Sequence, residues 1–270
     1  HLPSAPEHDR LEEQSDAIIA VMGGKVTHAP LPPSINRAID VGCGTGTTTV
    51  HLGQKFPTAL VYGIDLNEVP TTHQKPANVS YIKGDVLELT NKDERLQAKS
   101  LDYVYSRLIP LGMDNWNGYI NTAFNLLKPG AWAEIQELDF VFYDKNSERI
   151  DSDWKWLQEV RKTAHKKGLD MNSGSHSLSY LQEAGFADVT TTQYVWPLGR
   201  WQEHPDGNLM AKHSTETWPD IFCHLTQAML HKTHSEEEIK PLLEEIRRTL
   251  VPGEEGKHMK FFVTLGRKPQ

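Results

Sequence analysis

Residues 38–53 read AIDVGCGTGTTTVHLG, and this stretch decides the fold. It begins inside an apolar run at residues 35–42 that has the composition of a buried strand. Gly42, Gly44 and Gly46 follow, and the threonines behind them start a segment with the pattern of a helix. Because glycine lacks a Cβ atom, its backbone adopts positive φ values and lets a ligand approach the main chain. The stretch therefore predicts a strand, a tight turn and a helix N-terminus whose free N–H groups suit a carboxylate or a phosphate.

Strands and helices alternate along the N-terminal half of the chain. The later strands are predicted at residues 59–66, 79–86, 100–108 and 131–138, and helices between them at residues 46–55 and 115–128. Short buried strands joined by helices form a parallel sheet with right-handed crossovers. Two more strands are predicted at residues 188–196 and 257–268, and no helix follows the last one. One of these two strands is therefore expected to run antiparallel.

The remaining segments carry helical patterns. Apolar side chains recur at helical spacing in residues 8–22, 153–168 and 175–186. Residues 208–250 are mostly helical, with Pro219, Pro241 and the acidic run at 235–238 as expected breaks. We expect one α/β domain over residues 1–270.

Composition and charge disfavour several kinds of partner. The formal net charge is −8 and no long run of Lys or Arg occurs, so we expect no nucleic-acid partner. No run of about 18 apolar residues occurs, so no membrane span is predicted. We interpret Cys43 and Cys223 as reduced thiols of a cytoplasmic protein. His231 and His234 lack a third ligand placed by a motif, so no metal is predicted, and a homodimer stays open.

The spacing around the glycine turn distinguishes between nucleotide ligands. Thr47 stands where the dinucleotide fingerprint GxGxxG has its third glycine, and Asp40 precedes the turn in a DxGxGxG pattern that fits S-adenosylmethionine better. Asp65 closes the second strand about twenty residues further on, the spacing at which a carboxylate holds ribose hydroxyls. Asp85 follows the third strand and is placed to accept from an adenine amino group, with Val86 against the ring. Each acid alone also fits a turn or an N-cap, but signals at three successive strand ends favour one nucleoside ligand.

Several stretches, taken in order, resemble one family. The chain is similar to the fungal LaeA-like, TAM-domain, class I S-adenosylmethionine-dependent methyltransferases of secondary metabolism. The matching stretches are HDRLEEQ at 8–14, MGGKVTHAPLP at 22–32, AIDVGCGTG at 38–46, LDYVYSR at 101–107, LLKPGAWAEIQELDF at 126–140, LQEAGF at 181–186, WPLGRW at 196–201 and FFVTLGRKP at 261–269. The segment at 168–178 departs from the family pattern, and we relate it to substrate choice.

The resemblance implies an architecture, a cofactor and its contacts. It implies a Rossmann-like, mostly parallel sheet of seven strands with an antiparallel last strand, a helical N-terminal lid and a helical insert near the C-terminus. It divides the domain into a lid helix and linker at 1–34, a cofactor-binding core at 35–140, substrate-side helices and an insert at 141–257, and a closing strand at 258–270. It also implies S-adenosylmethionine as the cofactor. Arg107 would lie at the mouth of the site, and Gln14, with Arg10 near it, would lie on the lid. The full set of expected cofactor contacts is Asp40, Gly42, Cys43, Gly44, Gly46, Asp65, Leu66, Asp85, Val86, Ser106, Arg107 and Gln14.

The expected reaction depends little on general acid–base catalysis. A sulfonium carries its own leaving group, so the protein mainly aligns the acceptor with the methyl carbon and excludes water. A general base helps when the acceptor is a phenol, an enol or an amine. We predict His176 in the divergent segment, His224 in the insert, and Glu137 with Asp139 after the fifth strand as candidates. Surface histidines and a structural carboxylate are the alternatives.

Aromatic residues gather near the insert, and three functions remain open. Tyr194, Trp196, Trp201, Trp218 and Phe222 either wall a pocket for a flat, apolar small-molecule acceptor or belong to the core. We predict a methyltransferase that O-methylates a small molecule in fungal secondary metabolism. The alternatives are a LaeA-like regulatory or protein methyltransferase with a protein partner, nuclear rather than cytoplasmic, and a fold that binds S-adenosylmethionine for a non-methyl reaction.

Overall fold

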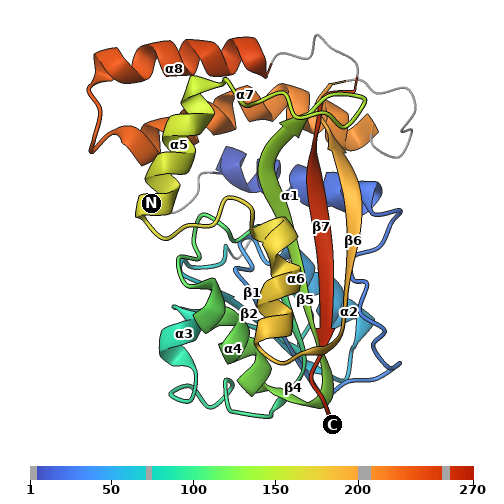
Figure 1. The fold of residues 1–270 in the computed structure, drawn as a ribbon. Helices are drawn as coiled ribbons and strands as arrows, with labels where there is room; N and C mark the ends of the chain where they lie inside the picture. The colour runs from blue at the N-terminus through green and yellow to red at the C-terminus, as the bar shows by residue number, and fades with distance from the viewer. Residues whose placement is uncertain (1–4, 71–74, 200–207, 251–255) are drawn as a thin grey trace.

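A single seven-stranded sheet runs through the molecule in the order β3-β2-β1-β4-β5-β7-β6 (Figure 1). The structure is a computed structural model and describes residues 5–70, 75–199, 208–250 and 256–270. All pairings are parallel except those of β7 with β5 and β6. The strands are β1 Arg37–Val41, β2 Leu60–Asp65, β3 Val79–Lys83, β4 Leu101–Arg107, β5 Leu127–Tyr143, β6 Ala187–Pro197 and β7 His258–Arg267. The expected mostly parallel sheet with an antiparallel last strand is confirmed.

Helices cover both faces of the sheet. The helices are α1 Ala5–Val21, α2 Thr47–Lys55, α3 Val86–Leu89, α4 Trp116–Leu126, α5 Lys155–Lys166, α6 Ser173–Glu183, α7 Asn208–Leu230 and α8 Glu236–Thr249. On one face, Leu52 of α2 and Phe56, the C-cap residue of that helix, pack against the buried Val61 of β2. On the other face, α4 and α6 bury Ile120 and Leu181 against β1, β4 and β5. The apolar patterns of these helices therefore specify the two cores of the sheet.

The helical insert forms a cap on the long strands β5, β6 and β7. Figure 1 shows α5, α7 and α8 above the sheet, with α1 beneath α7. Strand β5 was expected at residues 131–138 but spans 127–143, because Phe140 and Phe142 continue it into the cap core. There Phe142 packs against Trp154, with ring centroids 4.9 Å apart, and against Phe222, with centroids 5.9 Å apart.

The sequence predicts helix breaks at two prolines of the cap, but neither proline ends its helix. Pro219 lies inside α7 and Pro241 inside α8, and both helices continue through them. An internal proline costs a helix about 3 kcal/mol. In α7 the neighbouring Trp218 and Phe222 are buried in the cap core, and this packing outweighs the local cost. The break falls before α8, where Ser235 and Glu238 form a capping box.

A buried carboxylate fastens the segment after α1 to the sheet. Glu134 of β5 is 0% exposed, and it accepts backbone N–H bonds from His28 and Ala29 at 2.9 to 3.0 Å. The Tyr103 hydroxyl and the Gln136 amide each donate a bond of 2.7 Å. Burial alone would raise the pKa of Glu134, but these donors outweigh burial and hold the pKa below its usual value. The backbone at residues 28–29, beyond the end of α1, is thereby held against the sheet.

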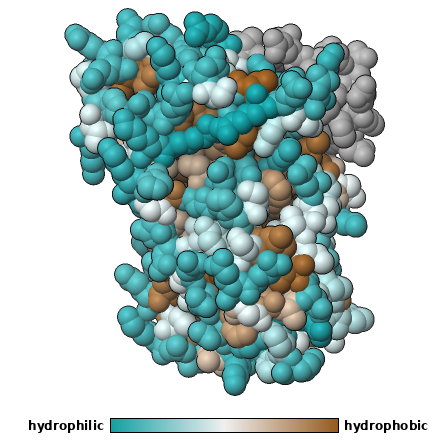
Figure 2. All heavy atoms as spheres, in the orientation of Figure 1, coloured by the Kyte–Doolittle hydropathy of each residue, from teal (hydrophilic) through white to brown (hydrophobic). Residues whose placement is uncertain are grey.

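The surface carries no extended apolar region on the face that Figure 2 shows, where brown spheres form small separated groups among hydrophilic side chains. The large apolar side chains that are exposed among the described residues are Leu60, Leu66, Leu111 and Leu209. No helix in the described part of the chain is long and apolar enough to cross a bilayer.

Replacing Glu134 with leucine should lower the free energy of unfolding by about 3 kcal/mol or more. The change leaves several buried donors without an acceptor, at about 1–3 kcal/mol each, whereas Glu134→Gln keeps one carbonyl oxygen and should cost less. Because the folded pKa lies below 4.5, the stabilisation is complete above that pH and is lost as the pH falls through the lowered value. Denaturant titration at several pH values measures both effects. A loss no greater than that of the exposed control Glu237→Gln would contradict the anchoring.

Candidate functional site

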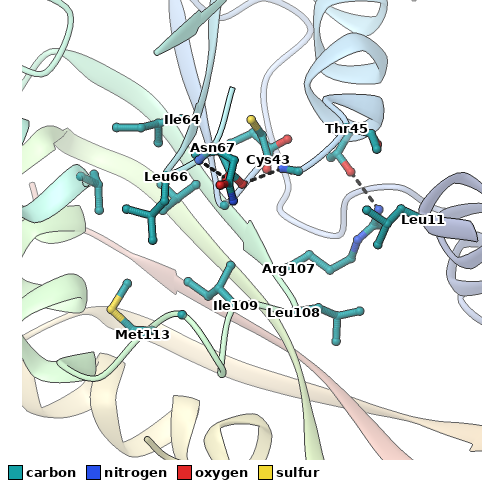
Figure 3. Close-up of a pocket in the computed structure, with 18 of the residues that line it drawn as sticks. Leu11, Cys43, Thr45, Ile64, Leu66, Asn67, Arg107, Leu108, Ile109 and Met113 are labelled. Carbon is teal, nitrogen blue, oxygen red and sulfur yellow. Dashed lines mark hydrogen bonds between the residues drawn. The ribbon is translucent and has the colours of Figure 1, made fainter. Parts of the chain in front are cut away.

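A cavity of about 390 Å³ opens at the carboxyl ends of β1 to β4, beneath α1 (Figure 3). Ligands of open α/β sheets bind at this edge. Residues at the end of each of the four strands or just after it line the cavity, among them Gly42, Asp65, Asp85 and Arg107. The expected helical lid is also present, because α1 contributes Leu11, Gln14, Ser15 and Ile18 to the lining.

In the turn after β1, neighbouring atoms restrict Gly42, whereas the space around Gly44 is open. Gly42 has φ of 69°, and a Cβ atom there would lie 2.3 Å from Cγ2 of Ile109, so packing excludes any side chain. Gly44 has φ of 55°, and a Cβ atom there would meet nothing within 4 Å. The backbone at Gly44 is therefore open to a ligand that enters the cavity. Gly46, with φ of 82°, precedes α2 as its N-cap.

The two acids predicted to hold a nucleoside both line the cavity and both have structural bonds. Asp65 accepts from the backbone N–H of Gly44 and of Asn67, each at 2.9 Å. Asp85 is the N-cap of α3, where Oδ1 accepts from Leu87 N at 2.8 Å. The turn and N-cap interpretations are thus correct for these residues, and they also fix where each carboxylate faces the cavity.

Asp40 places a nearly buried carboxyl in the cavity floor. It is 2% exposed, and its Oδ2 accepts from Thr49 Oγ1 at 2.7 Å. Burial raises the pKa of Asp40 to about 7, although the Thr49 bond and the Arg107 charge act in the opposite direction. A cationic ligand would favour the ionised form and lower this pKa.

Arg107 joins three elements around the cavity. Its Nη2 donates to Ser15 Oγ of α1 at 2.8 Å and to Thr48 Oγ1 of α2 at 3.0 Å. Its Nη1 is buried and has no hydrogen-bond partner in the described part of the chain. Figure 3 shows the side chain extending from β4 toward α1, with its end beside Leu11.

Most of the expected cofactor contacts gather at this cavity. Gly46 and Ser106 are the exceptions, since neither lines it, and Ser106 is buried within β4. Sequence reasoning missed the wall segment at residues 108–113, where Leu108, Ile109 and Met113 line the cavity. The position of this segment directly after the fourth strand could have predicted its place in the cavity wall. Figure 3 shows this wall segment across the cavity from Cys43, Ile64 and Asn67.

The three predicted catalytic residues lie in different places, and none lines the cavity. Glu137 is buried on β5 behind the wall segment, where Oε1 accepts from Ile109 N at 2.8 Å. Burial raises its pKa to about 8, and its Oε2 has no partner among the described side chains and backbone. His176 is exposed on α6, with Nδ1 2.8 Å from Asp170 Oδ2, and His224 is exposed on α7.

Two further candidates, Asp139 and Arg10, also lie outside the cavity lining. Asp139 accepts from the backbone N–H of Ser175 at 2.9 Å and does not line the cavity. The residues that the structure describes contain no cluster of metal-binding side chains. Arg10 lies on α1 outside the lining, and both cysteines are buried free thiols.

Of the two interpretations of the aromatic residues, the core interpretation holds for three of them. Trp196 of β6 and Trp218 and Phe222 of α7 are buried together in the cap core. Tyr194 instead bonds His28, with its hydroxyl 2.6 Å from Nε2. Trp201 lies outside the described residues.

The variants Gly44→Ala and Gly42→Ala should differ in their effects, because a side chain at Gly44 would block a ligand and one at Gly42 would overlap the protein. Each variant places a side chain at positive φ, which costs about 1–2 kcal/mol, and Gly42→Ala adds an overlap with Ile109 worth about 1–3 kcal/mol. We expect Gly44→Ala to weaken S-adenosylhomocysteine binding at least tenfold with a small change in unfolding temperature. Gly42→Ala should lower both. Calorimetric titration and thermal unfolding measure them, and unchanged affinity in Gly44→Ala would contradict the assigned approach.

Affinity for S-adenosylmethionine should rise between about pH 6 and pH 8. Above its pKa of about 7 the Asp40 carboxyl is ionised and attracts the positive charges of the ligand, whereas below that pH it is neutral. Asp40→Asn should bind more weakly at high pH and lose most of this dependence. Equilibrium titration at constant ionic strength measures the slope, with the exposed Asp153→Asn as control. The same slope in Asp40→Asn as in wild type would exclude this residue as its source.

Sequence comparison places the chain among methyltransferases. Residues 10–191 match the model of the family described as "Methyltransferase domain". The chain is 26% identical over 202 residues to Methyltransferase pytC of Aspergillus terreus, which covers 74% of this chain and 60% of that protein. It is 28% identical over 232 residues to the secondary metabolism regulator laeA of Coprinopsis cinerea, over 77% of this chain and 54% of that protein. The chain thus spans between half and two thirds of the length of these relatives.

Solved structures share the fold. One neighbour is the geranyl diphosphate C-methyltransferase of Streptomyces coelicolor A3(2) in complex with S-adenosyl-L-homocysteine, with a TM-score of 0.52 and 12% identity over 97% of this chain and 81% of that one. Another is the Haemonchus contortus phosphoethanolamine N-methyltransferase 2, also with S-adenosylhomocysteine, with a TM-score of 0.50 and 16% identity over 95% of this chain and 52% of that one. The cofactor expected from the sequence is the one whose product these neighbours contain. The likeness to LaeA-like methyltransferases is confirmed, and the chain belongs to the methyltransferase-domain family.

Proposed function

We propose that this chain binds S-adenosylmethionine in the cavity and transfers its methyl group to a small-molecule acceptor. The observation that supports this most directly is the convergence of the open Gly44 backbone, Asp65 and Asp85 on one cavity from three successive strand ends. The residues fit the cofactor, because a glycine cradle, two acids and a buried guanidinium nitrogen without a partner match a molecule with a sugar, a base and an amino-acid end.

Each group of the cofactor has a matching side chain in this proposal. Asp65 accepts from the ribose hydroxyls, since a carboxylate has lone pairs beyond those used by Gly44 and Asn67. Asp85 accepts from the adenine amino group, and the side chains of Leu66 and Val86 contact the ring. The amino-acid end then lies toward the glycine turn.

We further propose an oxygen acceptor in fungal secondary metabolism. The acceptor hydroxyl would form the new bond to the methyl carbon as the carbon–sulfur bond breaks, which leaves S-adenosylhomocysteine, and its proton would pass to a general base or to water. Leu11 of α1 and Leu108 and Ile109 of the wall segment give the cavity an apolar side, which would exclude water from the reacting groups. Of the three predicted catalytic residues, Glu137 is the one that contacts this wall, through the bond from Ile109 N, so we keep it as the candidate base although it does not line the cavity.

A transfer assay tests the proposal. Purified protein is incubated with S-adenosylmethionine labelled at the methyl group and with phenolic, enolic and amine acceptors, and labelled product is counted. We expect label in a phenol or enol, and at least a hundredfold less with Asp65→Ala, with the exposed Asp153→Asn as control. Binding of S-adenosylhomocysteine without transfer to any acceptor would favour a non-methyl reaction. Absence of binding to either form of the cofactor would overturn the proposal.

A regulatory function is the second candidate, because several similar proteins are secondary metabolism regulators by name. In that case the acceptor or partner is a protein and the chain acts in the nucleus. Affinity capture of the chain from a fungal extract, followed by size-exclusion chromatography, distinguishes the two. A stable partner at fixed stoichiometry, together with no small-molecule transfer, would favour regulation.

A further inference from the structure

We propose that His213 of the cap helix α7 forms a pH-sensitive contact with the lid helix α1, which is close while the imidazole is neutral and loosens when the imidazole is protonated. Because α1 lines the cavity, closure of the cavity then depends on pH. The inference concerns the protein without a ligand, so it goes beyond the proposed function and does not need it to hold.

Helix α1 uses different side chains for the cavity and for the cap. Gln14 and Ser15 line the cavity. Ala17 is fully buried in the cap core, which also contains Met210 and Trp218 of α7. The two helices pack against each other, and Figure 1 shows α1 beneath α7. A displacement of α1 from α7 therefore takes the lid side chains away from the cavity.

His213 lies on the side of α7 that faces α1. It is 4% exposed, and neither ring nitrogen has a hydrogen-bond partner in the described part of the chain. The charged groups that affect the ring are Arg10 and Glu13 of α1 and Glu216 of α7 itself. Strand β6 and helices α5 and α8 also pack against α7, but no charged group among their described residues affects the ring.

This environment favours the neutral imidazole. The neutral ring leaves one donor and one acceptor unbonded here, whereas the protonated ring would leave two donors and a buried charge. Burial therefore lowers the pKa of His213, and the charge of Arg10 lowers it further. Glu13 and Glu216 act in the opposite direction, but both are exposed to water, which screens their effect.

The lowered pKa determines the sign of the pH dependence. In an open state the ring reaches water and its pKa returns to about 6.5, so the open state binds a proton more readily than the closed state. The contact is fully stable above about pH 6.5 and weakens as the pH falls below that value. The equilibrium constant for opening rises by at most about tenfold for each pH unit, because a single proton is bound.

Two other groups near α1 titrate in the same range and have to be separated from His213. His51 of α2 has a lowered pKa because of burial and the charge of Arg107, while Asp16 of α1 raises it. Asp40 in the cavity floor has a pKa of about 7. A pH profile of the wild-type protein cannot distinguish these groups, so each needs its own variant.

Hydrogen exchange in α1 of the protein without ligand tests the proposal. Amide exchange in Ala5–Val21 is measured at about pH 7.5 and about pH 5.5, and each rate is divided by the intrinsic rate at that pH. We expect opening of α1 to increase at least fivefold at the lower pH in the wild type. His213→Gln and His213→Met should change less than about twofold. The matched control His224→Gln, an exposed change on the same helix, should behave as wild type.

His51→Gln and Asp40→Asn should also keep the wild-type response. Loss of the response in either of them, its persistence in both His213 variants, or its absence from the wild type would overturn the proposal. Exchange in β1 and β4 reports whether each variant is folded. A nuclear magnetic resonance titration of the His213 ring in the wild type needs no folded variant, and a pKa of about 6.5 or higher would also overturn the proposal. Because no ligand is used, a failure of cofactor binding affects the proposed function alone.

Discussion

The ligand cavity depends on a set of hydrogen bonds that ties the turn after β1 to the end of β2. The carbonyl of Ile64 accepts from Gly42 N at 2.8 Å and from Cys43 N at 3.1 Å, and Asp65 accepts from Gly44 N. These bonds hold the glycines at positive φ before any ligand arrives. A flexible turn would lose entropy on binding, so a turn held in place by its neighbouring strand makes the cavity preorganised.

A second set of contacts determines how α1 covers the cavity. Glu134 holds the backbone at His28 and Ala29, and this fixes the path of the chain that leaves α1. At the other contact, Ser15 meets Arg107 at the end of β4. Helix α1 and the segment after it thus contact the sheet at two places, one inside the core and one at the cavity.

The sequence predicts the site well where strand order alone determines position. Asp65 and Asp85 end two successive strands, and the carboxyl ends of parallel strands share one edge, so their meeting needed no knowledge of packing. The wall segment at residues 108–113 was not predicted, because its place depends on Ile109 reaching across to Gly42 and on a bond from Ile109 N to Glu137. The cap shows the same limit. Local rules predict a break at Pro219, but burial of Trp218 and Phe222 overrides them, and burial of a residue depends on the whole chain.

The order of strands also bears on how the protein is made. Strand β7 lies between β5 and β6, and in the described part of the chain β6 pairs with β7 alone. The ribosome synthesises β6, α7 and α8 before β7. Strand β6 therefore has no partner strand to pair with until β7 has been synthesised. Strands β1 to β4 have no such delay, because each pairs with strands that lie close to it in the sequence or precede it. Synthesis should therefore leave a half-assembled intermediate with the edge of β5 unprotected, and the last strand both completes the fold and shields that edge from other chains.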